Sequence, residues 1–168
     1  MIRPFVDGDA ARVRELFIRI NRLLAPPHLK DDFERYIARS LTEEIDRIAD
    51  YYRERGGGFW VATEASWIVG MFGLEPSPIA GSMELRRMYV DVEARGRGIA
   101  RKMLAFAEVE CRHRGLSQLE LSTSELQVEA LSLYRNSGYQ QVREETALAA
   151  SNKTIGGGIR RFHFMKRL

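Results

Sequence analysis

The residues best placed to do chemistry form the short run Arg95-Gly96-Arg97-Gly98-Ile99-Ala100. Its two glycines lack Cβ atoms, so the main-chain N–H groups can approach an anion closely. Apolar residues at helical spacing follow the run, and the first turn of a helix presents unpaired N–H donors and about half a positive charge. Cationic side chains surround it at Arg95, Arg97, Arg101 and Lys102. The combination predicts a site for a ligand with several phosphate charges, such as a pyrophosphate.

Two better-known phosphate-binding motifs do not match this run. A Gly-x-x-x-x-Gly-Lys-Ser/Thr loop is absent from the chain, and a dinucleotide fingerprint would need a third glycine where Arg101 stands. The remaining alternative is a glycine-rich connection with ordinary surface arginines, since short glycine patterns recur by chance. The neighbouring elements must decide between these interpretations.

A strand and a helix are expected on the two sides of the run. Leu85 to Val90 is apolar and β-prone, whereas apolar residues recur at helical spacing afterwards, at Ile99, Met103, Phe106 and Ala107. The sequence therefore predicts a strand, a tight loop and a helix start, which would aim the loop N–H groups and the helix N-terminus at one ligand.

Four linked segments resemble the GCN5-related N-acetyltransferases. Arg95-x-x-Gly98-x-Ala100 is similar to the family signature Arg/Gln-x-x-Gly-x-Gly/Ala. Glu84 to Val90 resembles the fourth strand of the family, and Leu119 to Thr123 resembles the fifth. The stretch Ala130 to Tyr139 resembles the next helix with its Ala-x-x-Leu-Tyr-x-x-x-Gly-Phe/Tyr ending. The resemblance is close over residues 84–139 and loose in the flanks.

The resemblance implies one domain over residues 1–168, of mixed α/β (α+β) type. It implies a mostly antiparallel sheet of six to seven strands, splayed between the fourth and fifth, with about four helices. Periodicity predicts a strand over 2–6, a helix with Val13, Leu16, Phe17 and Ile20 on one face, and a helical region over 31–55. A hairpin is expected over 59–63 and 67–74, and later strands through Val142 and over 162–165.

Acetyl-CoA is the acetyl donor that the resemblance implies. Residues 95–100 would hold its pyrophosphate together with Arg101, and the strand residues Met88, Tyr89 and Val90 would lie along the cofactor. Main-chain groups of Met88 and Val90 would contact the pantetheine arm. Gln127 occupies the place where many relatives carry Asn, and its amide can still donate and accept hydrogen bonds.

Acetyl transfer from a thioester to an amine requires a base for the ammonium, a donor for the carbonyl oxygen and an acid for the departing thiolate. Glu84 is the candidate base, with Glu75 as runner-up and a water chain as a further route. In a regular strand, Glu84 would share one face with Arg86, Met88 and Val90. Alternatively, Glu84 is a solvated charge or the partner of a nearby arginine.

Tyr134 is the candidate acid, because a phenol can protonate a thiolate or donate a hydrogen bond to it. Its alternative role is that of a core tyrosine, since Leu126, Ala130, Leu133 and Tyr134 follow a one-face helical pattern. Main-chain donors near Met88 would serve the oxyanion if the strands splay there, as the resemblance implies.

We therefore expect an N-acetyltransferase that acts directly on a primary amine, on a small molecule such as an amino acid or polyamine. The alternatives are a protein or peptide N-acetyltransferase and a non-catalytic acyl-CoA-binding regulatory module. A longer acyl donor stays open. The stretch Ser151 to Gly158, which ends in three glycines, is either a mobile loop between the last two strands or a flap over the substrate.

Composition agrees with this expectation without deciding it. The 168 residues carry a net charge of +3, and 45% are hydrophobic, as is ordinary for a globular domain. The chain shows no apolar run of membrane-spanning length and no signal-peptide core, so we expect a cytoplasmic protein without a membrane partner. We expect no nucleic-acid partner, because the basic residues are dispersed, and no metal. Cys111 is expected to be a buried, inert thiol, and a homodimer stays open.

Overall fold

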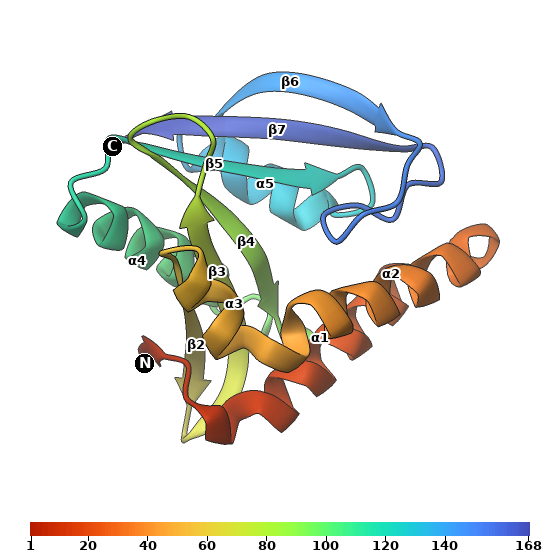
Figure 1. The fold of residues 1–168 in the computed structure, drawn as a ribbon, viewed down its shortest axis with the longest axis horizontal. Coiled ribbons are helices and arrows are strands. Elements are labelled where there is room, and N and C mark those ends of the chain that lie inside the picture. The colour runs from red at the N-terminus through yellow and green to blue at the C-terminus, as the bar shows by residue number, and fades with distance from the viewer.

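One continuous sheet of seven strands organises the chain in the computed structural model, which describes all 168 residues (Figure 1). The strands are β1 (Ile2–Pro4), β2 (Gly58–Glu64), β3 (Trp67–Pro76), β4 (Ser82–Val90), β5 (Gln118–Ser124), β6 (Gln140–Ala147) and β7 (Ile159–Arg167). Their order is β1-β2-β3-β4-β5-β7-β6, and only β4 and β5 are parallel. The expected mostly antiparallel sheet is confirmed.

Five α-helices accompany the sheet: α1 (Ala10–Leu24), α2 (Lys30–Glu43), α3 (Ile48–Glu54), α4 (Ile99–His113) and α5 (Val128–Asn136). The expected helical region over 31–55 is not continuous. The backbone leaves the helical conformation at Glu44, with φ −141° and ψ −60°, and a short 3-10 turn over Ile45–Arg47 precedes α3. No helix is both long and apolar enough to cross a bilayer.

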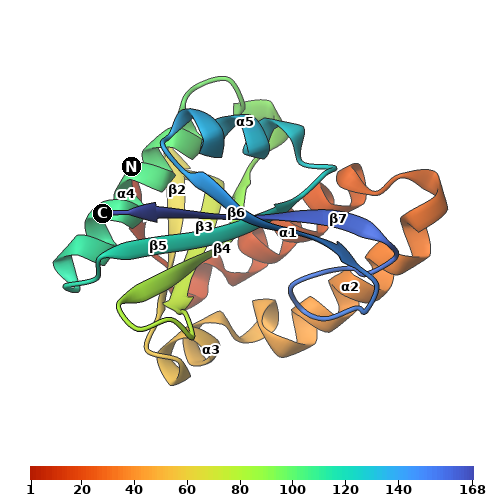
Figure 2. The same cartoon turned by 90° about the horizontal axis from the view of Figure 1, so that it is seen from above.

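Apolar residues form two cores on opposite faces of the sheet. One core contains α4 and α5 residues such as Met103, Leu104 and Leu131, packed with β4, β5 and β7. The other contains the buried faces of α1, α2 and α3, including Leu16, Phe17 and several aromatic residues. Figure 2 shows α1 and α2 together on the side of the sheet away from α4 and α5. Helices and apolar side chains therefore cover both faces of the central strands, whereas β6 at the edge is largely exposed.

The parallel pair β4 and β5 separates part-way along its length. Pairing runs only from Ser82 with Gln118 to Leu85 with Leu121, so the later residues of both strands have no partner across the gap. Figure 1 shows the two strands diverging. The splay that the resemblance implied is confirmed, and it leaves main-chain groups of β4 free on one edge.

A β-bulge interrupts β4 beside this gap. The register with β3 passes from Gly73 opposite Arg86 to Met71 opposite Tyr89, and Arg87 adopts a positive φ of 55°. The extra residue reverses the alternation of side chains. Met88 and Val90 pack against the core of α4 and α5, whereas Arg86 contacts Glu44, which lies between α2 and α3, and Tyr51 of α3. The prediction that Glu84, Arg86, Met88 and Val90 share one face is therefore wrong.

Candidate active site

The loop before α4 presents a row of free main-chain donors. Gly96 and Gly98 have φ angles of 76° and 75°, which residues with a side chain rarely adopt. The N–H of Arg95 bonds to Val92 and that of Lys102 bonds to Gly98, but none of the six N–H groups between them has a main-chain acceptor. Six consecutive free amides at a helix N-terminus are an arrangement suited to binding an anion.

A cavity of about 620 Å³ lies against this loop. All of the residues predicted to bind the cofactor line it except Arg97, and they come from β4, the loop, α4 and the start of α5. Arg97 instead directs its guanidinium to Glu64, at 2.8 Å, and to the carbonyl of Glu93. Only the main-chain N–H of Arg97 is therefore in position to serve an anion.

Gln127 lies at the end of β5, in front of α5, and its amide oxygen is already engaged. It accepts hydrogen bonds from Thr123 Oγ1 at 2.9 Å and from the Ser124 N–H at 3.3 Å. The side chain therefore fixes the turn between β5 and α5, and its NH₂ group remains the part that can contact a ligand.

A second, smaller cavity of about 100 Å³ lies on the other side of the gap between β4 and β5. Glu84 and Tyr134 both line it. Four residues line both cavities, namely Leu24, Met88, Tyr89 and Gln127. The two cavities thus meet where the strands splay. Two ligands, one in each cavity, would therefore have their ends next to each other at this point.

Glu84 has one ionic partner in the second cavity. Its carboxylate oxygen Oε2 accepts a hydrogen bond from Lys153 Nζ at 2.7 Å, and its side chain is 20% exposed. The expected alternative of an arginine partner is wrong, because the partner is a lysine from the loop between β6 and β7. A carboxylate with a single, partly exposed cationic partner can exchange that partner for another ammonium.

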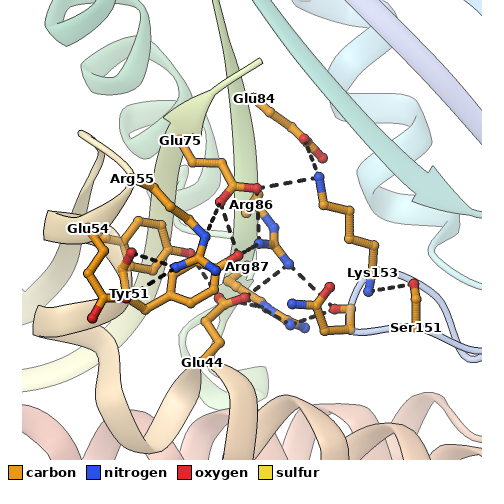
Figure 3. A network of polar contacts seen from close by, with 12 residues as sticks. Glu44, Tyr51, Glu54, Arg55, Glu75, Glu84, Arg86, Arg87, Ser151 and Lys153 are labelled. Carbon is orange, nitrogen blue, oxygen red and sulfur yellow. Dashed lines mark hydrogen bonds and ion pairs between the residues drawn. The ribbon is translucent and has the colours of Figure 1, made fainter. Parts of the chain in front are cut away.

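Glu75 stands directly opposite Glu84 in the pairing of β3 with β4, but it is more fully engaged. It is buried and accepts hydrogen bonds from the Tyr51 hydroxyl at 3.0 Å and from Arg86 at 3.1 Å. Lys153 Nζ lies 3.4 Å from Glu75 Oε1, the same oxygen that accepts the hydrogen bond from Arg86 (Figure 3). The oxygens of Glu75 are therefore occupied by structural contacts.

Tyr134 is 5% exposed and packs against Tyr139 and Phe164. The Tyr134 hydroxyl makes no hydrogen bond within the chain, but its oxygen keeps some accessible surface, because Ser40 Oγ is the one fully buried side-chain atom without a partner. The hydroxyl of Tyr139, by contrast, donates to Glu108 at 3.0 Å. Burial raises the pKa of Tyr134 above its ordinary value, and the nearby Tyr89 raises it further. The phenol is therefore protonated at neutral pH and has a hydrogen to donate.

A buried charge network beneath Glu75 and Glu84 was not found from the sequence. Glu44, which has no exposed surface, pairs with Arg86 and with Arg87 at 3.0 Å each (Figure 3). It also accepts a hydrogen bond from Tyr52 at 2.9 Å. Burial raises the pKa of Glu44, but Arg87, Arg86 and the hydrogen bonds lower it by more, so that the net pKa is below its ordinary value.

One signal for this network is present in the sequence. Glu44 follows Leu41 by three residues and precedes Ile48 by four, so it occupies a position on the apolar stripe of the helical region. A carboxylate at a core-facing position needs a buried cationic partner. The sequence pattern does not indicate which arginines supply it.

The stretch Ser151 to Gly158 lies over the second cavity. It joins β6 to β7, as expected of a loop between the last two strands. The carbonyl of Asn152 accepts hydrogen bonds from Arg87 at 2.6 Å and from Arg86 at 3.4 Å, and Ile155 is buried in the core of α1 to α3. The loop therefore forms one wall of the candidate acceptor site.

Cys111 and the histidines lie outside both cavities. Cys111 is fully buried in the core beneath α4, as expected, and burial raises the pKa of its thiol to about 11. His163 bonds to Glu145 at 2.8 Å on neighbouring strands β6 and β7. No group of three or more histidine, cysteine, aspartate and glutamate side chains is arranged to hold a metal ion.

The fold and the two joined cavities define the class of protein. A sheet split between its one parallel pair, with a free-amide loop and helix on the β4 side of the split, is the fold of the GNAT acetyltransferases. Residues 55–141 match the model of the acetyltransferase (GNAT) domain, and the chain belongs to this family.

Relatives and solved structures agree with the assignment. N-acetyltransferase 8B of Rattus norvegicus is 32% identical over 114 residues, 65% of this chain and 51% of that protein. N-acetyltransferase family 8 member 2 of the same organism is 30% identical over 133 residues, 77% of this chain and 58% of that protein. The chain thus matches only about half the length of these relatives.

Two crystal structures share the fold over nearly the whole chain. A GNAT-family acetyltransferase from Staphylococcus aureus Mu50 has a TM-score of 0.76 at 20% identity, covering 99% of this chain and 98% of that one. The PaiA N-acetyltransferase from Thermoplasma acidophilum, in complex with coenzyme A, has a TM-score of 0.75 at 19% identity, covering 100% and 98%.

Proposed function

We propose that the protein is an acetyl-CoA-dependent N-acetyltransferase that transfers the acetyl group directly to a primary amine of a small molecule. The observation that carries the proposal is the junction of the two cavities at the splay of β4 and β5. One cavity offers free main-chain donors for an anionic ligand, and the other holds a carboxylate and a protonated phenol. A donor and an acceptor bound there would meet end to end.

The larger cavity fits coenzyme A by the chemistry of its lining. The free N–H groups of residues 96–101 suit the diphosphate, with Arg95 and Arg101 as further cationic donors. The exposed edge of β4 at Met88 and Val90 offers main-chain groups to the amide-containing arm. When bound there, acetyl-CoA supplies the activated acetyl thioester.

Glu84 is the proposed general base. An ammonium must lose its proton before its nitrogen can attack a carbonyl, and a carboxylate in hydrogen-bonding reach can accept that proton directly or through water. Glu84 already holds an ammonium at 2.7 Å and has no other ionic partner. Glu75 is the weaker candidate, because Tyr51 and Arg86 occupy its oxygens.

Tyr134 is the proposed general acid. Its side chain lines the acceptor cavity, and its hydroxyl, which is not fully buried, makes no hydrogen bond within the chain. A departing thiolate would supply that acceptor and take the proton. Main-chain donors of β4 near Met88, on the edge that β5 leaves free, would stabilise the negative charge on the carbonyl oxygen.

The size of the acceptor cavity favours a small molecule. Its volume of about 100 Å³ lies beneath the loop of Ser151 to Gly158 and beside residues of α1 and α2, and it suits a small amine better than a long stretch of polypeptide. A non-catalytic acyl-CoA-binding module would have no reason to bring Glu84 and Tyr134 together, and both line this one cavity.

The release of coenzyme A thiol tests the proposal. The purified protein is incubated with acetyl-CoA and a panel of amino acids, polyamines, aminoglycosides and basic peptides, while acetyl-CoA binding is measured separately by calorimetry. We expect thiol release that depends on one class of small amine. Tight binding without release for any amine would favour the regulatory module, and release only with peptides would favour a protein acceptor.

A further inference from the structure

A lysine of the chain itself occupies the place of an acceptor amine. Lys153 Nζ lies 2.7 Å from Glu84 Oε2 and 3.4 Å from Glu75 Oε1, and Figure 3 shows its side chain extended between the two carboxylates. The chain has three other lysines, Lys30, Lys102 and Lys166, and none of them lines the acceptor cavity. Lys153 is therefore the one primary amine of a side chain within reach of the proposed base.

The loop that carries Lys153 is fixed on both sides of it. Asn152 is bound through its carbonyl to Arg86 and Arg87, which are themselves buried against Glu44. On the other side, Ile155 is buried in the core of α1 to α3. The Lys153 side chain, 47% exposed, extends from this anchored backbone into the mouth of the cavity.

A general base has to lie within hydrogen-bond distance of the amine that it deprotonates. Lys153 and Glu84 meet that requirement in the folded chain, without any substrate. Tethering of the amine beside the base also removes the entropic cost of bringing an acceptor from solution. We propose that Lys153 is a self-acetylation site, at which the protein transfers an acetyl group to its own Nζ. The inference rests on the proposed function.

The transfer balances without a further reactant. Glu84 takes one proton from the Lys153 ammonium, and the freed nitrogen pair forms a bond to the acetyl carbonyl carbon of acetyl-CoA. The bond between that carbon and sulfur breaks, and Tyr134 gives its proton to the sulfur. The nitrogen loses its second proton to the Tyr134 phenolate through water, and Glu84 later releases its proton to solvent. The net products are an amide at Nζ, coenzyme A thiol and one proton. The amide is neutral, so the ion pairs that hold the Lys153 side chain against Glu84 and Glu75 are lost.

Peptide mapping after incubation with acetyl-CoA alone tests the inference. Trypsin cuts after Lys153 in the unmodified chain, but acetylation blocks that cut and joins residues 144–153 to residues 154–160 in one peptide. We expect Lys153 to be acetylated at least ~10²-fold faster than the other three lysines, a factor typical of general base catalysis. The rate constant should not change with protein concentration, because the reaction occurs within one molecule.

Two variants separate enzymatic from spontaneous acetylation. Glu84→Gln keeps an oxygen that can accept a hydrogen bond from Lys153 but cannot take a proton, so Lys153 acetylation should fall about 10²-fold or more. Lys30→Arg, on the exposed start of α2, should leave Lys153 acetylation unchanged. Equal acetylation of all four lysines, or a rate that Glu84→Gln does not alter, would overturn the inference.

The result is distinguishable from a failure of the proposed function. If thiol release with free amines is rapid while Lys153 stays unmodified in their absence, the self-acetylation inference is wrong and the acetyltransferase proposal stands. If the protein binds acetyl-CoA but acetylates neither a free amine nor Lys153, both the acetyltransferase proposal and the self-acetylation inference are wrong.

Discussion

Glu84 and Glu75 are paired across β3 and β4, yet their surroundings give them different chemistry. Glu75 is buried in a network of tyrosine and arginine donors, whereas Glu84 contacts one lysine that is nearly half exposed. A base must release its resting partner to accept a proton from a substrate. Glu84, which has fewer partners, is therefore the better candidate for the base, although both are the same residue type.

Glu84→Gln should lower turnover by about 10² to 10⁴-fold, the range that a general base contributes. The free energy of unfolding should change by less than about 1 kcal/mol, since the variant loses only one partly exposed ion pair. Steady-state rates against pH give the decisive measurement, because the acidic limb that reports the base should disappear. Retention of the full rate and of that limb would shift the role to Glu75 or to a water chain.

Tyr134→Phe should also lower turnover by about 10² to 10⁴-fold when the chemical step is rate-limiting. Its stability cost should be small, because the hydroxyl has no hydrogen-bond partner to lose. Tyr139→Phe is a matched control in the same core, since its hydroxyl bonds to Glu108 and neither residue lines either of the two cavities. Thermal unfolding and single-turnover rates for both variants check the prediction. Wild-type turnover in Tyr134→Phe would make Tyr134 a core residue only.

At the scale of elements, two local departures from regular structure form the site. The bulge at Arg87 turns the arginine side chain toward α2, and it sends Met88 to the opposite face. The loop before α4 holds two glycines at positive φ and leaves six amides unpaired. Each departure removes regular main-chain hydrogen bonds, and the main-chain groups left unpaired are then available to a ligand.

Gly98→Asp should weaken acetyl-CoA binding by at least ~1 to 3 kcal/mol, because a carboxylate would face the diphosphate at a position of positive φ. Gly115→Asp is the control at the other end of α4. It has a similar φ of 73° and, like Gly98, open space around an added Cβ. Calorimetry on both variants separates backbone strain from the loss of the anion site. Equal affinities of the two variants would contradict the assignment of this loop.

At the scale of the whole molecule, the buried charges connect the helices on one side of the acceptor cavity to strand β4 and to the loop over the cavity. Glu44, at the break between α2 and α3, holds Arg86 and Arg87 of β4, which in turn hold Asn152 of the loop over the cavity. Breaking a buried pair by removing one partner is costly, because the remaining charge is left uncompensated. The network therefore links global stability to the shape of the acceptor site.

Glu44→Gln should destabilise the protein by about 3 to 5 kcal/mol at neutral pH. Glu54→Gln on α3, which removes a surface pair with Arg47, should cost less than about 1 kcal/mol. Urea unfolding of both variants measures the difference. A loss for Glu44→Gln no larger than that for Glu54→Gln would show that the buried charges contribute nothing specific.

The same carboxylate should make stability depend on acid. Because the pKa of Glu44 is lowered in the folded state, its contribution is present above the ordinary glutamate pKa of about 4.3 and is lost as pH falls through the lower, folded-state value. The free energy of unfolding of the wild type should therefore fall more steeply below about pH 4 than that of Glu44→Gln. Parallel curves for the two proteins would contradict this account.

Much of the site follows from the sequence, because it depends on neighbours along the chain. Positive φ at Gly96 and Gly98, the strand before them and the helix after them are local properties of residue type and spacing. The position of Tyr134 on α5 follows from helical periodicity in the same way. Patterns of this kind can be recognised in the sequence because they depend only on residues within one or two turns of the chain.

The tertiary structure decided what contacts these segments. Lys153 meets Glu84 across 69 positions of sequence, and Arg87 meets Glu44 across 43. The bulge at Arg87 and the length of pairing between β4 and β5 depend equally on neighbouring strands. Contacts between distant residues leave no periodic signal, because their partners are fixed only when the sheet and helices pack. The sequence by itself determined the loop, strand and helix that suit coenzyme A, and packing alone determined which charges surround the acceptor.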